Sequence, residues 1–317
     1  MREIQIEKNE SGQRLDKFLK KYLREATGGF IYKMLRKKNI KLNGGRAEGK
    51  ELLQPGDVVT LYLSEETLEK FRGIHQKGIH YPVTKLDIIY EDDNIILVNK
   101  PAGMLSQKAK PEDVSLVEYL LGYLQSEGKW HPGDTFTPGI CNRLDRNTSG
   151  LVIAGKSLLG TQMMSELLKK RALDKYYITI VEGVMTQSSL VKGYLSKDTA
   201  VNVSHIFGEP GEGRVYIETG YEPICHSDCY TLLRVKLITG KTHQIRSHLA
   251  SIGHPVINDR KYGGRNFKDL KHFLLHAETL HFPKLPEPLE ELSGQTFAAS
   301  VPEQFEEVKK YLFRYVK

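Results

Sequence analysis

The sequence predicts two folded units, a small N-terminal module of helices and short strands followed by a larger α+β domain. A chain of 317 residues has the length of about two domains. The spacing of apolar residues changes near residue 85. Lysine-rich segments with helical spacing precede it, and short apolar segments typical of strands follow it. With 39% hydrophobic and 27% charged residues, the composition is that of a globular protein. The chain has neither an apolar run of roughly 18 residues nor a signal peptide, so we expect a cytoplasmic protein without membrane contact.

Positive charge is concentrated in the N-terminal unit. The whole chain has a formal net charge of +7. Residues 11–50 contain twelve lysines and arginines against three acidic residues, a surplus of nine, so the other 277 residues must sum to −2. A local cationic segment favours a polyanionic partner, because neutralised phosphates release their counterions.

The elements of this unit follow from apolar spacing and turn residues. Residues 14–26 repeat apolar side chains at helical intervals and predict an amphipathic helix. The stretch Thr27-Gly28-Gly29 is expected to break that helix, and a second helix is expected from Phe30 until Asn39. Strands are predicted over 40–43 and 58–63. The polar residues 64–84 predict a linker, so the expected units are 1–63 and 85–317.

Two small helices followed by a β unit, with a basic second helix, resemble the RNA-binding module first named from a small-subunit ribosomal protein. The resemblance implies that the exposed cations of the second helix contact RNA: Lys33, Arg36, Lys37 and Lys38. A merely solvated charged face is the alternative interpretation.

The larger unit begins with predicted strands over 86–90 and 94–99, and helices are predicted over 114–124 and 158–170. Between these helices, residues 142–150 lead into an apolar strand over 151–154. Here Asp145 lies between Arg143 and Arg146, and small polar residues and a glycine follow. A carboxylate in such a positive field stays ionised, which suits a nucleophile or a base.

The same segment resembles the RluA family of RNA pseudouridine synthases. The family pattern His-Arg-Leu-Asp-x-x-Thr-Ser-Gly is matched at every fixed position except the first, where this chain has Asn142. Further matches follow in the family's order at residues 99–103, 175–177, 239–248, 253–255, 259, 262–263 and 275–277. The resemblance therefore covers nearly all of residues 85–285.

This resemblance implies an isomerase that converts uridine in RNA to pseudouridine, on a mixed, mainly antiparallel sheet with a central catalytic cleft. The reaction gains and loses no atom, so we expect no cofactor and no catalytic metal. The implied substrate is large-subunit ribosomal RNA, and transfer RNA remains an alternative. No zipper-like repeat suggests an oligomer, and we expect a monomer.

Carried over by motif, Asp145 is the essential carboxylate, which attacks the sugar carbon or removes a sugar proton; the sequence leaves both routes open. Tyr177 would stack on the flipped uracil and assist proton removal, while strand alternation should turn Tyr176 to the opposite face. Arg246 would pair with Asp145 across a hundred residues of chain. Arg143 would help to fill the gap that the flipped nucleotide leaves.

Several residues have competing interpretations. Asp16 repeats the tripeptide Arg-Leu-Asp without Thr-Ser-Gly, and helix capping or solvation is its expected role. Asn142 cannot titrate near neutral pH, and we expect it to support its loop. His243 and His248 are expected to form local hydrogen bonds.

Two other functional classes fit part of the sequence. A non-catalytic RNA-binding factor would retain the basic module, but the intact Asp145, Tyr177 and Arg246 favour an enzyme. A zinc hydrolase would use Cys225, His226 and Cys229, but no second ligand pair with zinc spacing follows, and we expect no metal site. Three cysteines also predict no disulfide framework.

Overall fold

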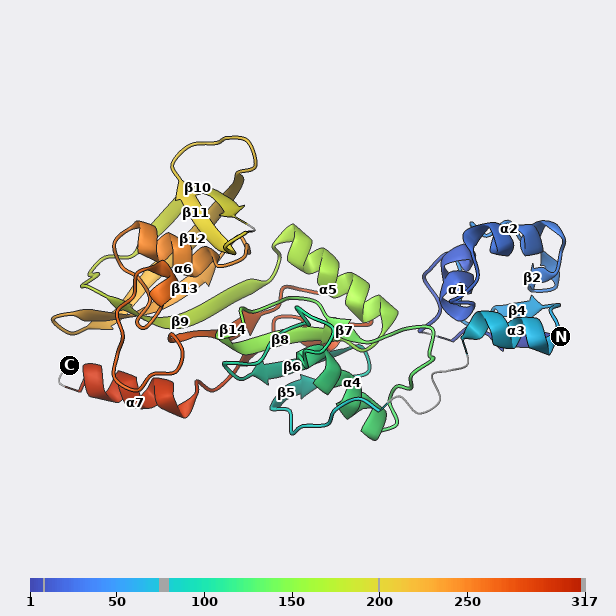
Figure 1. The fold of residues 1–317 in the computed structure, drawn as a ribbon, viewed down its shortest axis with the longest axis horizontal. Coiled ribbons are helices and arrows are strands. Elements are labelled where there is room, and N and C mark those ends of the chain that lie inside the picture. Colours follow the sequence, from blue (N-terminus) through green and yellow to red (C-terminus); the bar gives the residue numbers. More distant parts are fainter. Residues whose placement is uncertain (8, 74–79, 199, 315–317) are drawn as a thin grey trace.

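The structure, a computed structural model, describes residues 1–7, 9–73, 80–198 and 200–314. It contains a small four-stranded sheet and a large eleven-stranded sheet, each with its own helices (Figure 1). Among the described residues, no helix combines the length and apolar character that crossing a membrane requires.

The N-terminal module is built on a small antiparallel sheet in the order β1-β4-β2-β3. Its elements are β1 (Arg2–Gln5), α1 (Leu15–Tyr22), α2 (Gly28–Arg36), β2 (Ile40–Leu42), β3 (Gly45–Arg46), β4 (Val58–Leu61) and α3 (Glu65–Arg72). The apolar faces of α1 and α2 pack on the sheet around the fully buried Phe18, Ile31 and Val59. The module thus has a hydrophobic core of its own, and it lies at one end of the molecule (Figure 1).

Two expectations for this module differ from the structure. Gly28 and Gly29 do not interrupt the chain between helices but form the first turn of α2, because the hydroxyl of Thr27 caps that turn by accepting the N–H of Phe30 at 3.2 Å. The expected linker 64–84 contains helix α3, whose Leu68 is buried in the module core. Residues 74–79, from the same range, lie outside the described residues.

The larger domain confirms a mixed, mainly antiparallel sheet. Its strand order is β11-β10-β12-β13-β9-β14-β8-β6-β5, with β15 beside β14 and β7 beside β8. The elements are β5 (Ile88–Glu91), β6 (Ile95–Lys100), α4 (Leu116–Ser126), β7 (Gly139–Ile140), β8 (Ser149–Gly155), α5 (Leu158–Lys170), β9 (Asp174–Glu182), β10 (Ser189–Asp198), β11 (Val203–Phe207), β12 (Val215–His226), β13 (Tyr230–Leu237), α6 (Gln244–Ser251), the 3-10 helices η2 (Arg260–Tyr262) and η3 (Glu290–Leu292), β14 (Leu275–His281), β15 (Thr296–Ala298) and α7 (Glu303–Leu312).

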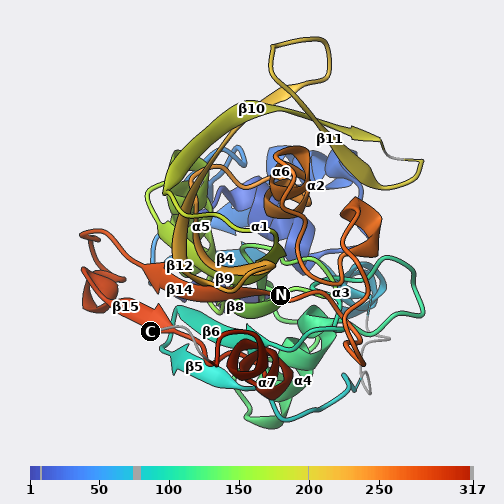
Figure 2. The same ribbon diagram turned by 90° about the vertical axis from the view of Figure 1, so that its left-hand side faces the viewer.

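Helices cover both faces of this sheet. On one face, α4 and α6 pack against alternate residues of the strands, such as Val152 on β8 and Val235 on β13. On the other face, α5 covers β8 through Met164 and Leu151, and α7 covers β9. Figure 2 shows β9, β12 and β10 curving around α6. This curvature places α6 inside a concave surface.

The parallel pair β8 and β14 sets the geometry beside α6. Among the described strands it is the one parallel pairing in the large sheet, and it joins Gly150 to Ala277. The backbone of Gly150 has a φ of +112°, and a Cβ there would lie 2.2 Å from the carbonyl oxygen of Ala277. Glycine is therefore required five residues after Asp145, where the loop enters the buried strand.

Candidate active site

Asp145 lies in the loop between β7 and β8, and hydrogen bonds hold the part of the loop that precedes it. Ser106 Oγ donates to the carbonyl of Leu144 at 2.7 Å and accepts its N–H at 3.1 Å. The side-chain oxygen of Asn142 accepts the N–H of Ile153 at 2.7 Å. The expectation that Asn142 supports the loop is confirmed, because this bond ties the loop to the centre of β8.

Arg246 on α6 meets Asp145, as the sequence predicted. Its Nη1 donates to Asp145 Oδ2 at 2.9 Å, although 101 residues separate the two in the chain. The other side of the guanidinium binds Asp259, with Nε donating to Oδ2 at 2.7 Å and Nη2 to Oδ1 at 2.8 Å. Both partners are buried, with side-chain exposures of 6% for Arg246 and 2% for Asp259. The side chain of Asp145 is 22% exposed, so it reaches the solvent while Arg246 holds it in place.

The guanidinium of Arg246 is also held between aromatic rings. Its central carbon lies 4.2 Å from the ring centroid of Phe273 and 5.0 Å from that of Tyr262. Burial opposes its charge, but the carboxylates of Asp259 and Asp145 keep the pKa of Arg246 above its usual value. Sequence reasoning noted Asp259 as a motif match without a role; its bidentate contact comes from the fold.

Hydrogen bonds from the hairpin of β10 and β11 hold His243 beside Asp145. The hydroxyl of Tyr262 accepts the N–H of Ser204 at 2.8 Å and lies 2.9 Å from His243 Nδ1. The other ring nitrogen of His243, Nε2, lies 3.9 Å from Asp145 Oδ2. Burial lowers the pKa of His243 to about 4, so the ring is neutral. Its predicted hydrogen bonding is confirmed, but its approach to Asp145 was not predicted.

Tyr177 on β9 faces the same side of the sheet. It is 7% exposed and belongs to the core that contains α6, whereas the ring of Tyr176 lies on the opposite face under Lys236 Nζ, 5.6 Å away. The predicted alternation is therefore confirmed. Burial, and after it the negative charge of Asp145, raise the pKa of Tyr177, so its phenol is neutral at physiological pH.

Lys100 is a buried lysine beside the site to which sequence reasoning gave no role. Its side chain is fully buried, and its ammonium donates to the carbonyls of Pro101, Met104 and Arg146 at 2.9, 2.9 and 3.1 Å. Burial lowers the pKa of Lys100 to about 7, and the charge of Asp145 opposes the shift. Lys100 thus joins the loop after β6 to the loop of Asp145. Its place in the motif Asn-Lys-Pro-Ala-Gly was the available signal.

The predicted RNA-contacting residues are all exposed. Arg143 is exposed two residues before Asp145. The exposed cations of the module lie on α2 and just after it, outside the carboxylate site: Lys33, Arg36, Lys37 and Lys38. Asp16, the sequence look-alike of Asp145, binds Arg14 at 2.9 Å and the hydroxyl of Tyr32 at 2.7 Å.

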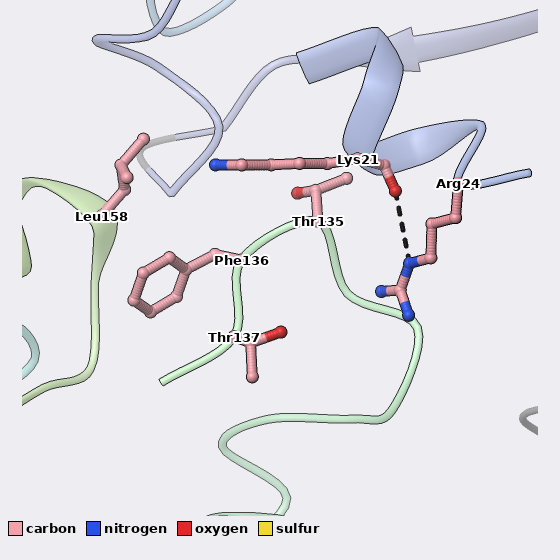
Figure 3. A pocket seen from close by; sticks show the side chains of 6 residues that line it. All are labelled: Lys21, Arg24, Thr135, Phe136, Thr137 and Leu158. Carbon is pink, nitrogen blue, oxygen red and sulfur yellow. Dashed lines mark hydrogen bonds between the residues drawn. The ribbon is translucent and has the colours of Figure 1, made fainter. Parts of the chain in front are cut away.

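A cavity of about 380 Å³ lies where the module meets the larger domain (Figure 3). It is lined by Lys21, Arg24, Thr135, Phe136, Thr137 and Leu158. Arg24 Nη2 donates to the carbonyl of Asp134 at 2.9 Å, and Thr135 Oγ1 donates to Glu10 at 2.8 Å, so hydrogen bonds cross this junction. The cavity contains none of the groups around Asp145.

Within the described part of the chain, no group of three or more His, Cys, Asp or Glu residues could hold a metal ion, and Cys225, His226 and Cys229 form no such group.

Comparisons with known proteins agree with this geometry. Residues 94–251 match the family described as RNA pseudouridylate synthase. The chain is 31% identical to an uncharacterized RNA pseudouridine synthase of Mycoplasma capricolum, over 92% of this chain and 94% of that protein. It is also 31% identical to ribosomal large subunit pseudouridine synthase C of Haemophilus influenzae (90% and 89% covered) and of Escherichia coli (88% and 88%).

Two solved structures share the fold. Human RNA pseudouridylate synthase domain containing 4 aligns with a TM-score of 0.56 at 20% identity, over 69% of this chain and 90% of that chain. Human RNA pseudouridylate synthase domain containing 1 aligns with a TM-score of 0.52 at 21% identity, over 73% and 96%.

Proposed function

Because the chain belongs to the RNA pseudouridine synthases, we propose that it isomerises specific uridines of large-subunit ribosomal RNA to pseudouridine. The enzyme class and an RNA substrate follow from the family. The choice of large-subunit ribosomal RNA is supported by the names of the Haemophilus influenzae and Escherichia coli relatives. Action on that RNA implies a cytoplasmic enzyme, and we propose that it works as a monomer.

The ion pair of Asp145 and Arg246 is the observation that carries the proposed mechanism. Arg246 occupies Oδ2 of the carboxylate, whereas Oδ1 has no hydrogen-bond partner among the described residues. One oxygen is therefore fixed and the other is available to the ribose of the target nucleotide. Attack of Oδ1 on the sugar carbon and removal of a sugar proton by Oδ1 use the same geometry, and both lead to release and rotation of the uracil.

Tyr177 offers an aromatic face to the flipped uracil. Stacking needs only the flat ring, and the neutral phenol keeps its proton in the free enzyme because its pKa is raised. We therefore assign Tyr177 to stacking first. Removal of the ring proton would require a base with a lower pKa than this buried phenol has.

RNA binding is assigned to the module of residues 1–63 and to Arg143. The cations of the module, Lys33, Arg36, Lys37 and Lys38, are exposed on one short helix and its end. Their contacts with phosphates would help to offset the few kcal/mol that extrusion of the target nucleotide costs. Arg143, exposed in the same loop as Asp145, is assigned to fill the space that the extruded nucleotide leaves.

The decisive experiment compares ribosomal RNA from cells with and without the gene, with pseudouridine mapped by carbodiimide-dependent reverse-transcription stops. Loss of a site in large-subunit RNA, restored by the wild-type gene and not by Asp145→Asn, is expected. An unchanged large-subunit map with a missing site in transfer RNA would refute the substrate assignment.

The module is tested separately by its salt dependence. Lys37→Gln/Lys38→Gln should flatten the slope of log Kd against log salt by about 0.7 to 0.9 for each phosphate that the variant no longer neutralises. The matched control is Lys309→Gln/Lys310→Gln on α7, which removes the same charge from the other end of the chain. Equal slopes for both variants would show that α2 is not the RNA anchor.

A further inference from the structure

Lys175 lies beside the catalytic face, and no acidic side chain among the described residues pairs with it. It lies two residues before Tyr177 on β9, and alternation along the strand places both side chains on the same face. Its side chain is half-buried, and its Nζ lies 3.6 Å from the point that a Cβ on Gly240 would occupy. Gly240 itself is exposed, in the loop that leads from β13 to α6. The ammonium therefore lies where this loop opens to solvent.

Neither group at this point bonds another part of the described chain. Among the described residues, the ammonium of Lys175 has no hydrogen-bond or ion-pair partner, and the N–H of Gly240 has no acceptor. Burial lowers the pKa of Lys175, and the nearby guanidinium of Arg171 lowers it further. A second cation nearby and the absence of a bonded acid in the described structure make this position unfavourable for an isolated ammonium.

Other lysines of the same region are paired. Lys236 on β13 binds Asp174 at 2.9 Å on the opposite face, and the buried Lys100 donates to three carbonyls. Lys175 thus departs from the local pattern. A bound anion would offset the free-energy cost of burying this unpaired ammonium. The anion that an RNA-modifying site must admit is the phosphodiester backbone.

We propose that Lys175, with the N–H of Gly240, binds a phosphodiester of the RNA strand next to the nucleotide that reaches Tyr177. Two residues along a strand span about 7 Å, which is the scale of one nucleotide, so a base stacked on Tyr177 keeps a neighbouring phosphate near Lys175. Arg171, which is exposed, adds positive potential to the same place. The inference deepens the proposed function, but it rests only on RNA being the ligand and not on which RNA is modified.

The test uses the full-length protein and a transcript of large-subunit ribosomal RNA, with Kd measured over a range of salt. Lys175→Met should weaken binding about tenfold at low salt and reduce the salt slope by about 0.7 to 0.9, while Lys175→Arg keeps the slope. Because an unpaired cation is removed, the Tm of Lys175→Met should equal or exceed that of the wild type.

Lys236→Met is the matched control. It removes the same charge from the opposite face, so the RNA affinity should stay close to wild type and the Tm should fall slightly with the loss of its pair with Asp174. An unchanged salt slope in Lys175→Met overturns the proposal. A larger fall in Tm for Lys175→Met than for Lys236→Met also overturns it, because Lys175 would then be structural.

This result is separable from the substrate assignment. If mapping in cells identifies transfer RNA as the substrate, the same measurement is repeated with that RNA, and the loss of slope in Lys175→Met should persist. Transcripts that carry one neutral methylphosphonate linkage near the target uridine provide the direct check. At the contacted linkage, wild type and Lys175→Met should bind equally, and a persistent difference at every linkage would refute a phosphate contact.

Discussion

Arg246 binds two carboxylates, those of Asp145 and Asp259. Substitution of Asp259 should lower the stability strongly, whereas substitution of Asp145 should abolish the chemistry with little loss of stability. In the wild type, the two carboxylate oxygens of Asp259 accept hydrogen bonds of 2.7 and 2.8 Å from the guanidinium of Arg246, whose side chain is 6% exposed. Asp259→Asn leaves a single carbonyl oxygen as the acceptor. Breaking a buried ion pair from one side costs about 3–5 kcal/mol. Asp145→Asn instead keeps an acceptor for the one 2.9 Å bond, at a side chain that is 22% exposed, while Asp259 still neutralises Arg246. Its cost should stay within about 1 kcal/mol.

Urea denaturation followed by tryptophan fluorescence measures this difference directly. The chain has one tryptophan, Trp130, which is buried in the core that α4 and α6 share. Asp145→Asn should form no pseudouridine yet bind RNA almost as well as the wild type. Asp16→Asn, at the other Arg-Leu-Asp tripeptide, is the control and should retain full turnover. Equal destabilisation by Asp145→Asn and Asp259→Asn, or turnover by a folded Asp145→Asn protein, would refute this account of the site.

Three further predictions concern the residues around this pair. Tyr177→Phe should bind RNA as tightly as the wild type because it keeps the stacking face, whereas Tyr177→Leu should weaken binding by about 1–3 kcal/mol in filter-binding assays. The pKa of Lys100 is about 7 in the folded protein and about 10.4 when unfolded, so between these pH values the unfolded chain binds one proton more. The unfolding free energy of the wild type should therefore rise by up to about 1.4 kcal/mol per pH unit relative to Lys100→Met, and parallel pH profiles would contradict this. Asn142→Ala should cost about 1–3 kcal/mol in urea denaturation, because the buried N–H of Ile153 loses its acceptor, while Asn142→His should restore most of that loss.

Elements with clear periodicity could be predicted from the sequence, and those decided by caps or sparse apolar residues could not. Helix α5 spans Leu158–Lys170, as its apolar spacing predicted. Gly28 and Gly29 were wrongly expected to separate the helices, because the cap on Thr27 outweighs the poor helix propensity of glycine. Helix α3 was assigned to a linker, since few of its residues are apolar, yet Leu68 is enough to dock it on the module.

The candidate site likewise contains features that could be predicted from the sequence and features that could not. The contact between Asp145 and Arg246 was predictable because their motifs imply it, and Tyr177 was distinguished from Tyr176 by strand alternation. The roles of Asp259 and Lys100 were not predictable, because a buried charge is interpretable only when its partners are known. Local composition favoured exposure for both residues, and only the fold supplies the guanidinium and the carbonyl groups that offset the cost of their burial.

The charge distribution explains why a separate module and local cations are both needed. Of the formal charge of +7, residues 1–84 carry +6 and residues 85–317 only +1, so net charge attracts RNA weakly to the catalytic domain. In the proposed function, the module supplies attraction that is independent of RNA sequence, and its exposed lysines lie outside the carboxylate site. A cation close to the proposed stacking ring of Tyr177 would help to place the target nucleotide over Asp145. Lys175 on β9, two residues from Tyr177 and without an ion-pair partner among the described residues, is the cation that we propose for this role.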